Sequence, residues 1–309
     1  MLEPAVIVLR LLQYAGAMVL FGSSLFLLYA LPEKGVGSGA ELSWSRRLLV
    51  WAAGVVLAAS LIGLLAHTSI LAGSIREGMT VSSLSAVIAT MSMGPSTLVR
   101  AAAAMVALGL LAVRRPDRVT WWLCAGLGAM VIASFAWMGH GAATEGAPGI
   151  ALLIADIVHA LAAGVWIGAL VAFLLLLTPR AASVELDGVL HRALHGFSGV
   201  GSTLVAILVA SGLVNSWFLV GPTRIPGLWT TLYGQLLSLK LALVLGMLAL
   251  AAANRFRLTP ALGAAIESGH ASNQALRRLR RSLLLEMTLS FIVLALVAWF
   301  GTLAPVSAQ

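Results

Sequence analysis

Asp156 and His159 lie one helical turn apart in an otherwise uncharged apolar stretch, the run ADIVHALAAGVWIGALVAFLLLLTP at residues 155–179. Ionisable side chains are expensive to place inside a membrane, so such a pair marks by default a path or a site for an ion, a proton or a cofactor. Asp156 and His159 are therefore the first candidates for chemistry, and their role depends on the elements that position them.

The chain as a whole has the composition of an integral membrane protein. Hydrophobic residues make up 60% of its 309 positions and charged residues 10%, which leaves too little polar surface for a water-soluble domain of this size. Eight apolar runs reach the length of about 20 residues that crosses a bilayer, near 5–31, 48–73, 96–113, 120–138, 149–178, 196–220, 232–253 and 282–304. Because these runs do not alternate as barrel strands do, the sequence predicts an all-α bundle forming one membrane domain, 1–309, with four-helix halves 1–148 and 149–309.

Basic residues concentrate in alternate loops between these runs. Fourteen of the nineteen lie there: Lys34, Arg46, Arg47, Arg114, Arg115, Arg118, Arg180, Arg192, Arg255, Arg257, Arg277, Arg278, Arg280 and Arg281. By the positive-inside rule these loops face the cytoplasm, so both termini are expected on the periplasmic side. Together with the six acids of the same loops, they account for the formal net charge of +8. The basicity therefore indicates topology and contact with membrane lipids, and not nucleic-acid binding.

This orientation gives each polar residue within a helix a depth, at about 1.5 Å per residue. His67 lies roughly 9 Å from the outer end of the second helix, and Asp156 and His159 lie roughly 10 and 15 Å into the fifth. Met138 and His140 close the outer end of the fourth helix. Imidazole and thioether together suit copper, with thioether favouring Cu(I) over Cu(II). We predict a copper site in the outer half in which Met138, His140 and His67 capture the ion at the rim and His159 with Asp156 takes it deeper. His67 could instead be a helix-packing histidine.

The loop between the second and third runs adds three thioethers, Met79, Met91 and Met93. Within residues 80–93, the apolar positions 84, 87, 88 and 91 follow the spacing of an amphipathic helix, which the Gly-Pro pair at 94–95 would end. We expect this helix to lie flat on the outer, periplasmic leaflet. Met91 or Met93 could also touch the metal, but methionines in an apolar chain mostly fill gaps.

Two further charged residues lie within the membrane runs. Lys240 is about 12 Å into the seventh run, which matches the depth of Asp156. We predict that Lys240 and Asp156 pair across the bundle, either to fix helix packing or to gate a path. Glu286, near the inner end of the eighth helix, is level with Asn254 and Arg255. It is predicted to form a polar clasp with them or to act as an exit ligand.

Small residues indicate where helices approach each other closely. Gly164 and Gly168 form a small-xxx-small pair on the fifth helix, and four glycines between positions 196 and 212 repeat the device on the sixth. Close packing of the fifth helix would also keep His159 in the bundle interior.

Four consecutive blocks of the C-terminal half resemble the CopD family of bacterial copper-resistance membrane proteins. They are HALAAGVWIGAL at 159–170, FSGVGSTLVAILVASGLVNSW at 197–217, YGQLLSLKLALVLGMLALAAANRFRLTP at 233–260 and RRSLLLEMTLSFIVLALVAWFGTLAP at 280–305. The N-terminal helices match mainly in number and placement, with GHGAA at 139–143 similar to a recurring Gly-His turn. The resemblance implies an eight-helix inner-membrane protein of copper uptake, encoded beside or fused to a periplasmic CopC-type copper-binding protein. No long polar segment stands at either end, so a separate CopC-like partner is implied.

The residues and the resemblance together favour a copper importer in the bacterial inner membrane. The sequence has no nucleotide-binding loop and no phosphorylation motif, so we expect passive conduction or gating and no enzyme activity. One alternative is a redox protein in which His67 and His159 hold a b-type haem or a fixed copper centre. Another is a copper sensor or a scaffold for a periplasmic partner, in which the metal binds but does not cross the membrane.

Overall fold

The computed structural model describes residues 3–30, 43–114, 117–138, 146–177, 184–267 and 273–308, and every regular element within them is a helix. Eight helices are long and apolar enough to cross a membrane. They are α1 (Glu3–Ala30), α2 (Ser43–Leu71), α5 (Met93–Val113), α6 (Arg118–Ser134), α7 (Gly146–Leu176), α8 (Val184–Leu219), α10 (Leu232–Ala253) and α12 (Asn273–Phe300). The predicted all-α fold with eight spans is therefore confirmed.

Shorter helices extend or connect the spans. The 3-10 helix η1 (Phe135–Met138) continues α6, and the π-helix η3 (Asn254–Leu258) joins α10 to α11 (Thr259–Glu267). Between α2 and α5 lie α3 (Ile75–Gly78) and α4 (Val81–Thr90), while α9 (Gly227–Thr230) precedes α10 and η4 (Val306–Ala308) follows α12.

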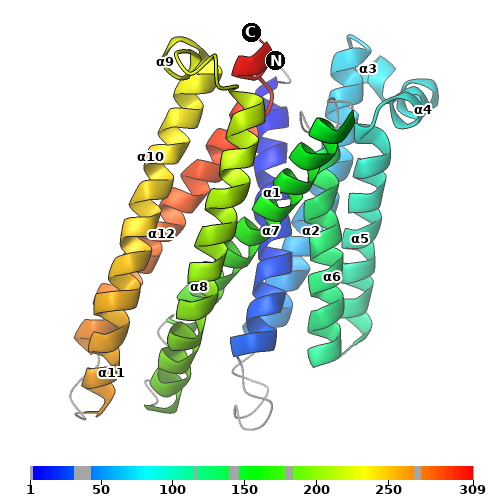
Figure 1. The fold of residues 1–309 in the computed structure, drawn as a ribbon. Helices are drawn as coiled ribbons and strands as arrows, with labels where there is room; N and C mark the ends of the chain where they lie inside the picture. Colours follow the sequence, from blue (N-terminus) through cyan, green and yellow to red (C-terminus); the bar gives the residue numbers. More distant parts are fainter. Residues whose placement is uncertain are drawn as a thin grey trace.

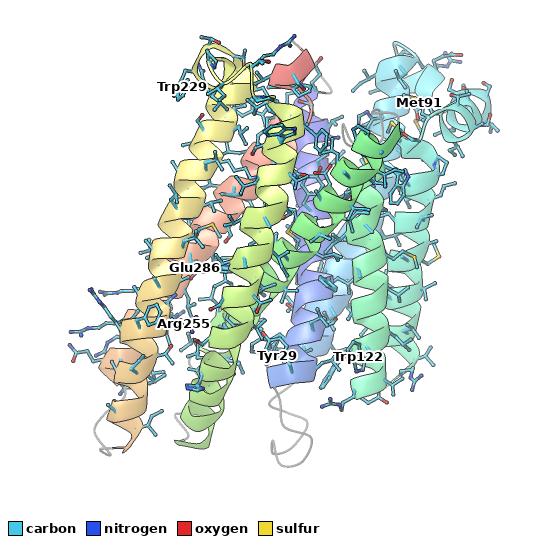
Figure 2. The ribbon with its side chains drawn as sticks, viewed as in Figure 1. Tyr29, Met91, Trp122, Trp229, Arg255 and Glu286 are labelled. Carbon is cyan, nitrogen blue, oxygen red and sulfur yellow. The ribbon has the colours of Figure 1, made fainter. Side chains whose placement is uncertain are left out.

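Both chain ends lie at the same end of the bundle, together with α3, α4 and α9 (Figure 1). We call this the outer end. The basic residues that flank α2, α5, α6 and α12 lie at the opposite, inner end. Exposed tryptophans occur near both ends (Figure 2), Trp229 at the outer and Trp122 at the inner, as in the aromatic belts of membrane proteins. For the basic residues that the structure describes, the predicted grouping is thus present, and its cytoplasmic assignment remains a prediction from the positive-inside rule.

The central helix of the bundle is α1, which packs against α2, α6, α7 and α12. Its contact with α7 is very close: a Cβ atom on Gly168 would lie 2.2 Å from the carbonyl carbon of Gly22. A Cβ atom on Gly22 would meet the carbonyl oxygen of Gly164 at 1.9 Å. The Ser23 hydroxyl donates across the same contact to the Gly168 carbonyl at 3.2 Å. The close approach predicted for Gly164 and Gly168 is confirmed, with α1 as the partner.

The peripheral helices are α8, which packs on α7, and α10, which packs on α12. The glycines predicted to bring α8 close to a neighbour do not all do so, since a Cβ atom on Gly196 or Gly199 would meet no atom within 4 Å. The prediction is wrong at these two positions because they face open space. Gly212 acts differently: a Cβ atom there would lie 3.6 Å from the ring of His159. Its missing side chain leaves room for the imidazole.

The segment predicted as an amphipathic helix contains α4, whose start is capped by the hydroxyl of Thr80. Val87 of this helix is buried, whereas Met91, just past its last turn, is exposed. Gly94 and Pro95 were predicted to end this helix. The helix ends at Thr90, and the two residues lie in the first turn of α5. Proline is tolerated there because its missing N–H has no partner in a first turn. The position of α4 on the outer leaflet stays a prediction.

Asp117 caps the start of α6 at the inner end. Its carboxylate accepts a hydrogen bond from the Thr120 backbone N–H at 2.7 Å and lies 3.7 Å from the guanidinium of Arg114. The hydrogen bonds from Thr120, first its side chain and then its backbone, hold the pKa of the Asp117 carboxyl below its usual value. The ionised carboxylate therefore favours the folded start of this helix.

Candidate metal centre

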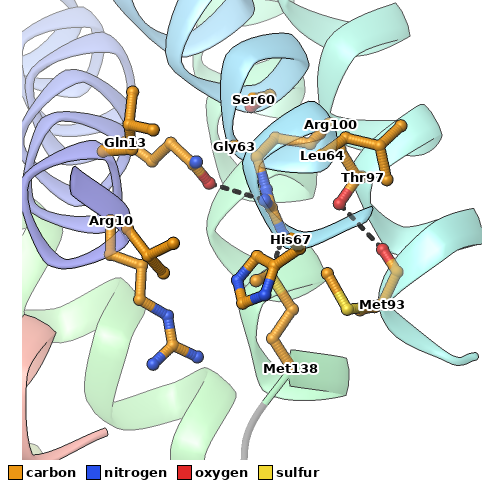
Figure 3. A pocket seen from close by; sticks show the side chains of 12 residues that line it. Arg10, Gln13, Ser60, Gly63, Leu64, His67, Met93, Thr97, Arg100 and Met138 are labelled. Atoms are coloured by element: carbon orange, nitrogen blue, oxygen red, sulfur yellow. Dashed lines mark hydrogen bonds between the residues drawn. The ribbon is translucent and has the colours of Figure 1, made fainter. Parts of the chain in front are cut away.

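A small pocket lies near the outer end of the bundle among α1, α2, α5 and η1 (Figure 3). It is lined by His67 of α2, by Met93 at the start of α5 and by Met138 at the end of η1. The volume of the cavity is about 10 Å³, which is room for one water molecule or one monatomic ion. The pocket therefore brings an imidazole and two thioethers around a space of ionic size.

The imidazole of His67 offers a nitrogen to a ligand. Its Nε2 atom is buried and has no hydrogen-bond partner. Buried polar atoms are rarely left unpaired, because the loss of hydration is then uncompensated. A metal ion in the pocket would bind this nitrogen. Next to it, the Thr97 hydroxyl donates to the backbone carbonyl of Met93 at 2.7 Å and fixes the first turn of α5.

Met138 is held by Arg100, a residue of α5 that is only 1% exposed. The guanidinium donates to Met138 Sδ at 2.9 Å, to Gln13 Oε1 at 2.7 Å and to Ser134 Oγ at 3.1 Å. Gln13 in turn donates to the backbone carbonyl of Ala59 at 2.9 Å. This network joins α1, α2, α5 and α6 around the pocket and orients the thioether of Met138.

Arg10, Gln13 and Arg100 were not among the predicted site residues. Arg10 and Arg100 each stand seven residues after the first residue of their helix, or about 10 Å along it. They meet the same criterion as Asp156 and His159, an ionisable group inside an apolar run. Applied to α1 and α5, that criterion would have found both arginines. Gln13 carries no comparable signal, because a neutral amide in a membrane helix is not distinctive by itself.

A second set of polar residues joins α7 to α8. Asn215 Nδ2 donates to Asp156 Oδ1 at 2.8 Å, and one turn deeper His159 Nδ1 lies 3.0 Å from Ser211 Oγ. The Ser211 hydroxyl donates its proton to the backbone carbonyl of Ile207 at 2.6 Å, so its oxygen accepts from the Nδ1–H of His159. This assigned tautomer leaves the lone pair of the imidazole on Nε2, the arrangement of a metal-ligating histidine.

Lys240 does not form the predicted direct pair with Asp156. Their charged atoms do not come within 4.0 Å of each other, whereas those of Arg114 and Asp117 do. The Asp156 carboxylate is bound by Asn215 instead, and the Lys240 ammonium lies 5.8 Å from the centroid of the Phe300 ring. The charges of Lys240 and Asp156 still interact electrostatically. Asn215, on the adjacent helix α8, is the hydrogen-bond partner of the carboxylate, so the predicted pairing is present only as this longer-range interaction.

Glu286 lies within the bundle on α12 and is 2% exposed (Figure 2). Asn254 Nδ2 donates to its Oε2 at 2.9 Å, and Trp166 Nε1 donates to its Oε1 at 2.8 Å. The predicted clasp with Asn254 is confirmed. Arg255 does not take part, because its guanidinium turns outward to Ser202. Trp166 was not predicted, since nothing in the sequence relates α7 to this position of α12.

The predicted metal-binding residues in the described ranges lie in two places, as the predicted capture and transfer steps require. His67 and Met138 line the same pocket with Met93, whereas Asp156 and His159 lie on α7 against α8. His140 lies outside the described residues. In the described ranges, no group of three or more His, Cys, Asp or Glu side chains could hold a metal ion. The donors of the outer pocket in these ranges are therefore one imidazole and two thioethers.

His67 and His159 do not face each other as the axial ligands of a haem would. The central helix α1 packs against both α2 and α7. His67 points into the α1–α2–α5 pocket, while the imidazole of His159 turns to α8. The geometry gives no support to the haem alternative.

The fold and the site define a class: a polytopic helical membrane protein with soft-metal donors gathered at one end of the bundle. Residues 1–150 match the family model described as copper resistance protein D-like, N-terminal domain, and residues 191–300 match the copper resistance protein D model. The chain is 37% identical over 305 residues to copper resistance protein D of Pseudomonas syringae pv. tomato, covering 98% of this chain and 97% of the relative. The chain therefore belongs to the copper resistance protein D family.

A more distant relative is the inner membrane protein YebZ of Escherichia coli (strain K12). It is 32% identical over 125 residues, which cover 40% of this chain and 41% of the relative. No solved structure matches the chain. The family makes this a copper-related, multi-pass membrane protein.

Proposed function

We propose that the protein imports copper across the bacterial inner membrane, taking it from the periplasm through the outer half of the bundle. Family membership supports copper as the cargo, and the name of the E. coli relative supports the inner membrane as the location. The observation that carries the proposal is the unpartnered Nε2 of His67 in a pocket shared with Met93 and Met138. One imidazole with two thioethers prefers Cu(I) to Cu(II).

When the ion is captured, the sulfur of Met138 leaves its hydrogen-bond donor Arg100 and binds the metal. Its sulfur accepts from Arg100 at 2.9 Å, and this contact is the weakest of the three that the guanidinium makes, because thioether sulfur is a poor acceptor. The bonds of Arg100 to Gln13 and Ser134 hold the arginine in place when the sulfur turns to the metal. The flexible thioether side chain makes this turn without moving a helix.

The second station is the pair Asp156 and His159 between α7 and α8. Ser211 orients the imidazole so that Nε2 is free to bind, and Asn215 holds one carboxylate oxygen of Asp156. The Asn215 carbonyl oxygen is itself buried and unpartnered. A cation that reaches this interface meets a nitrogen and two oxygen atoms. The charge of Lys240, which acts on both Asp156 and His159, opposes that cation and provides a gate.

The inner half offers one further set of donors, around Glu286. The carboxylate stands next to Asn254, whose amide oxygen is buried and unpartnered, and one turn from Ser290, which contacts Met247 Sδ at 3.8 Å. The π-helix that begins at Asn254 adjoins this set, and such irregular turns are frequent at functional sites. We assign the Glu286 region to release of the ion toward the cytoplasm.

In this proposal the protein is a carrier and not an enzyme, and it receives copper from a separate periplasmic protein of the CopC type. The donor would dock at the outer end, where α3, α4 and α9 lie (Figure 1). Copper resistance is the function in the relative's name, so the imported ion would serve copper homeostasis.

The test is copper uptake into proteoliposomes, measured as metal retained in the lumen. His67→Ala and His159→Ala should each reduce uptake strongly while insertion into the membrane is unchanged. Met138→Leu, which keeps the volume but removes the sulfur, should also reduce it. Met105→Leu is the matched control, because Met105 lies on α5 but its side chain is 58% exposed and does not line the pocket. Unchanged uptake in His67→Ala would remove the pocket from the path, and binding without any lumenal copper would identify a sensor.

A further inference from the structure

The pocket beside His67 carries positive charge without any acid. Arg10 is 8% exposed and Arg100 1% exposed, and none of the residues that line the pocket is Asp or Glu. A buried guanidinium loses its hydration and is stabilised only by a counter-charge or a full set of acceptors. Two such groups within a membrane span therefore point to a ligand that supplies what the protein does not.

The two arginines differ in how their nitrogens are satisfied. Arg100 directs its donors at three neutral acceptors, Gln13, Ser134 and Met138. Arg10 makes no hydrogen bond or ion pair with any residue of the described ranges, and its Nε atom is buried without a partner. Figure 3 shows the Arg10 side chain reaching into the region beside His67. Arg10 is thus the unsatisfied donor of the pocket, and Arg100 contributes charge.

Two more atoms of the same pocket lack partners, the Nε2 of His67 and the hydroxyl oxygen of Ser60. Ser60 lies seven residues before His67 on α2, about 10 Å along the helix, so the two cannot contact one ion in a cavity that holds about one water-sized sphere. The Arg10 Nε–H, beside His67, is a donor only, so it favours an anion over a cation. The size favours a monatomic anion, because phosphate, sulfate and carboxylates need more room.

We propose that this pocket binds a single small inorganic anion of halide size, held by the Nε–H of Arg10 beside His67. The anion supplies the negative charge that the two arginines lack. One consequence rests on the proposed function: because the pocket has room for one ion, copper that binds His67 displaces the anion.

The test is equilibrium binding of radioactive chloride to copper-free, full-length protein in detergent, with gluconate as the other anion at constant ionic strength. The wild-type protein should bind a single chloride per chain saturably. Arg10→Gln should weaken this binding by about tenfold or more, because it removes a charged hydrogen-bond donor. The matched control is Arg76→Gln, at an exposed arginine of α3 at the same end, which should bind as the wild type does.

Absence of saturable chloride binding in the wild-type protein would overturn the proposal, and so would unchanged binding in Arg10→Gln. Should that variant fail to fold, Arg10→Lys keeps the charge but loses the Nε donor, and intermediate affinity is expected. Because the assay contains no copper, its failure leaves copper import untouched. Absence of copper uptake by the wild-type protein, with chloride binding intact, would instead refute the proposed function alone.

Discussion

Replacing Glu286 with leucine should destabilise the bundle, because this carboxylate accepts from two buried donors. Trp166 Nε1 donates to one of its oxygens at 2.8 Å and Asn254 Nδ2 to the other at 2.9 Å. Leucine has a similar volume but accepts neither bond, so both donors are left unpaired in an apolar interior. Glutamine keeps one acceptor oxygen, so Glu286→Gln should destabilise the bundle about half as much as Glu286→Leu.

The magnitude follows from the number of bonds. A side-chain hydrogen bond between membrane helices contributes about 0.6 kcal/mol on average and up to about 1.7 kcal/mol. The loss of both bonds therefore costs roughly 1–3 kcal/mol, and the loss of one costs about half as much. At roughly 2–4 °C per kcal/mol for a large chain, Glu286→Leu should lower the Tm by about 2–12 °C.

Thermal unfolding of the purified protein in detergent measures this order. The neighbouring Leu285, on the same helix, is 57% exposed, so Leu285→Ala is a control that should melt close to the wild type. The expected sequence of Tm values is wild type, then Glu286→Gln, then Glu286→Leu. A leucine variant that melts at or above the wild-type temperature would refute the reasoning, since the two donors would then need no acceptor.

Three further predictions follow from other parts of the fold. Gly168→Ala should strongly destabilise the protein because its Cβ would lie 2.2 Å from the backbone of α1, whereas Gly199→Ala, which faces open space, should not; detergent melting compares them. Asp117→Ala should lower the Tm near neutral pH. The difference in Tm between wild type and variant should shrink as the pH falls through the depressed pKa of the folded carboxyl, below about 3.9. Equal differences in Tm at all pH values would contradict this. Ser211→Ala removes the hydrogen bond that orients His159 and should reduce lumenal copper uptake several-fold without changing stability much; full uptake would show that the imidazole needs no such partner.

The eight spans and the close contact at Gly164 and Gly168 could be predicted because each depends on local composition. About 20 apolar residues are needed to cross the bilayer, and a small-xxx-small pair permits backbone approach whatever the partner helix is. The same local reasoning failed at Gly196 and Gly199, because whether a glycine faces a neighbour depends on how its helix is rotated in the bundle. That rotation is set by packing and is not encoded in the spacing alone.

Side-chain partners show the same division. Depth along the helix placed Asn254 level with Glu286, and the structure joins them. Depth also matched Lys240 to Asp156, yet the carboxylate is bound by Asn215, since equal depth does not imply that two side chains face each other. The two arginines of the outer pocket were predictable as charges within apolar runs. Their convergence on His67 was not, because it requires α1, α2 and α5 to meet.

X-ray absorption at the copper edge of the copper-loaded protein tests most directly whether the outer pocket binds the metal. The account predicts sulfur scatterers from Met93 and Met138 together with an imidazole from His67, in a Cu(I) site. Met138→Leu should remove one sulfur and His67→Ala the imidazole, while Met105→Leu should leave the spectrum unchanged. A copper shell made only of nitrogen and oxygen, identical in the wild type and in the His67 and Met138 variants, would contradict the account.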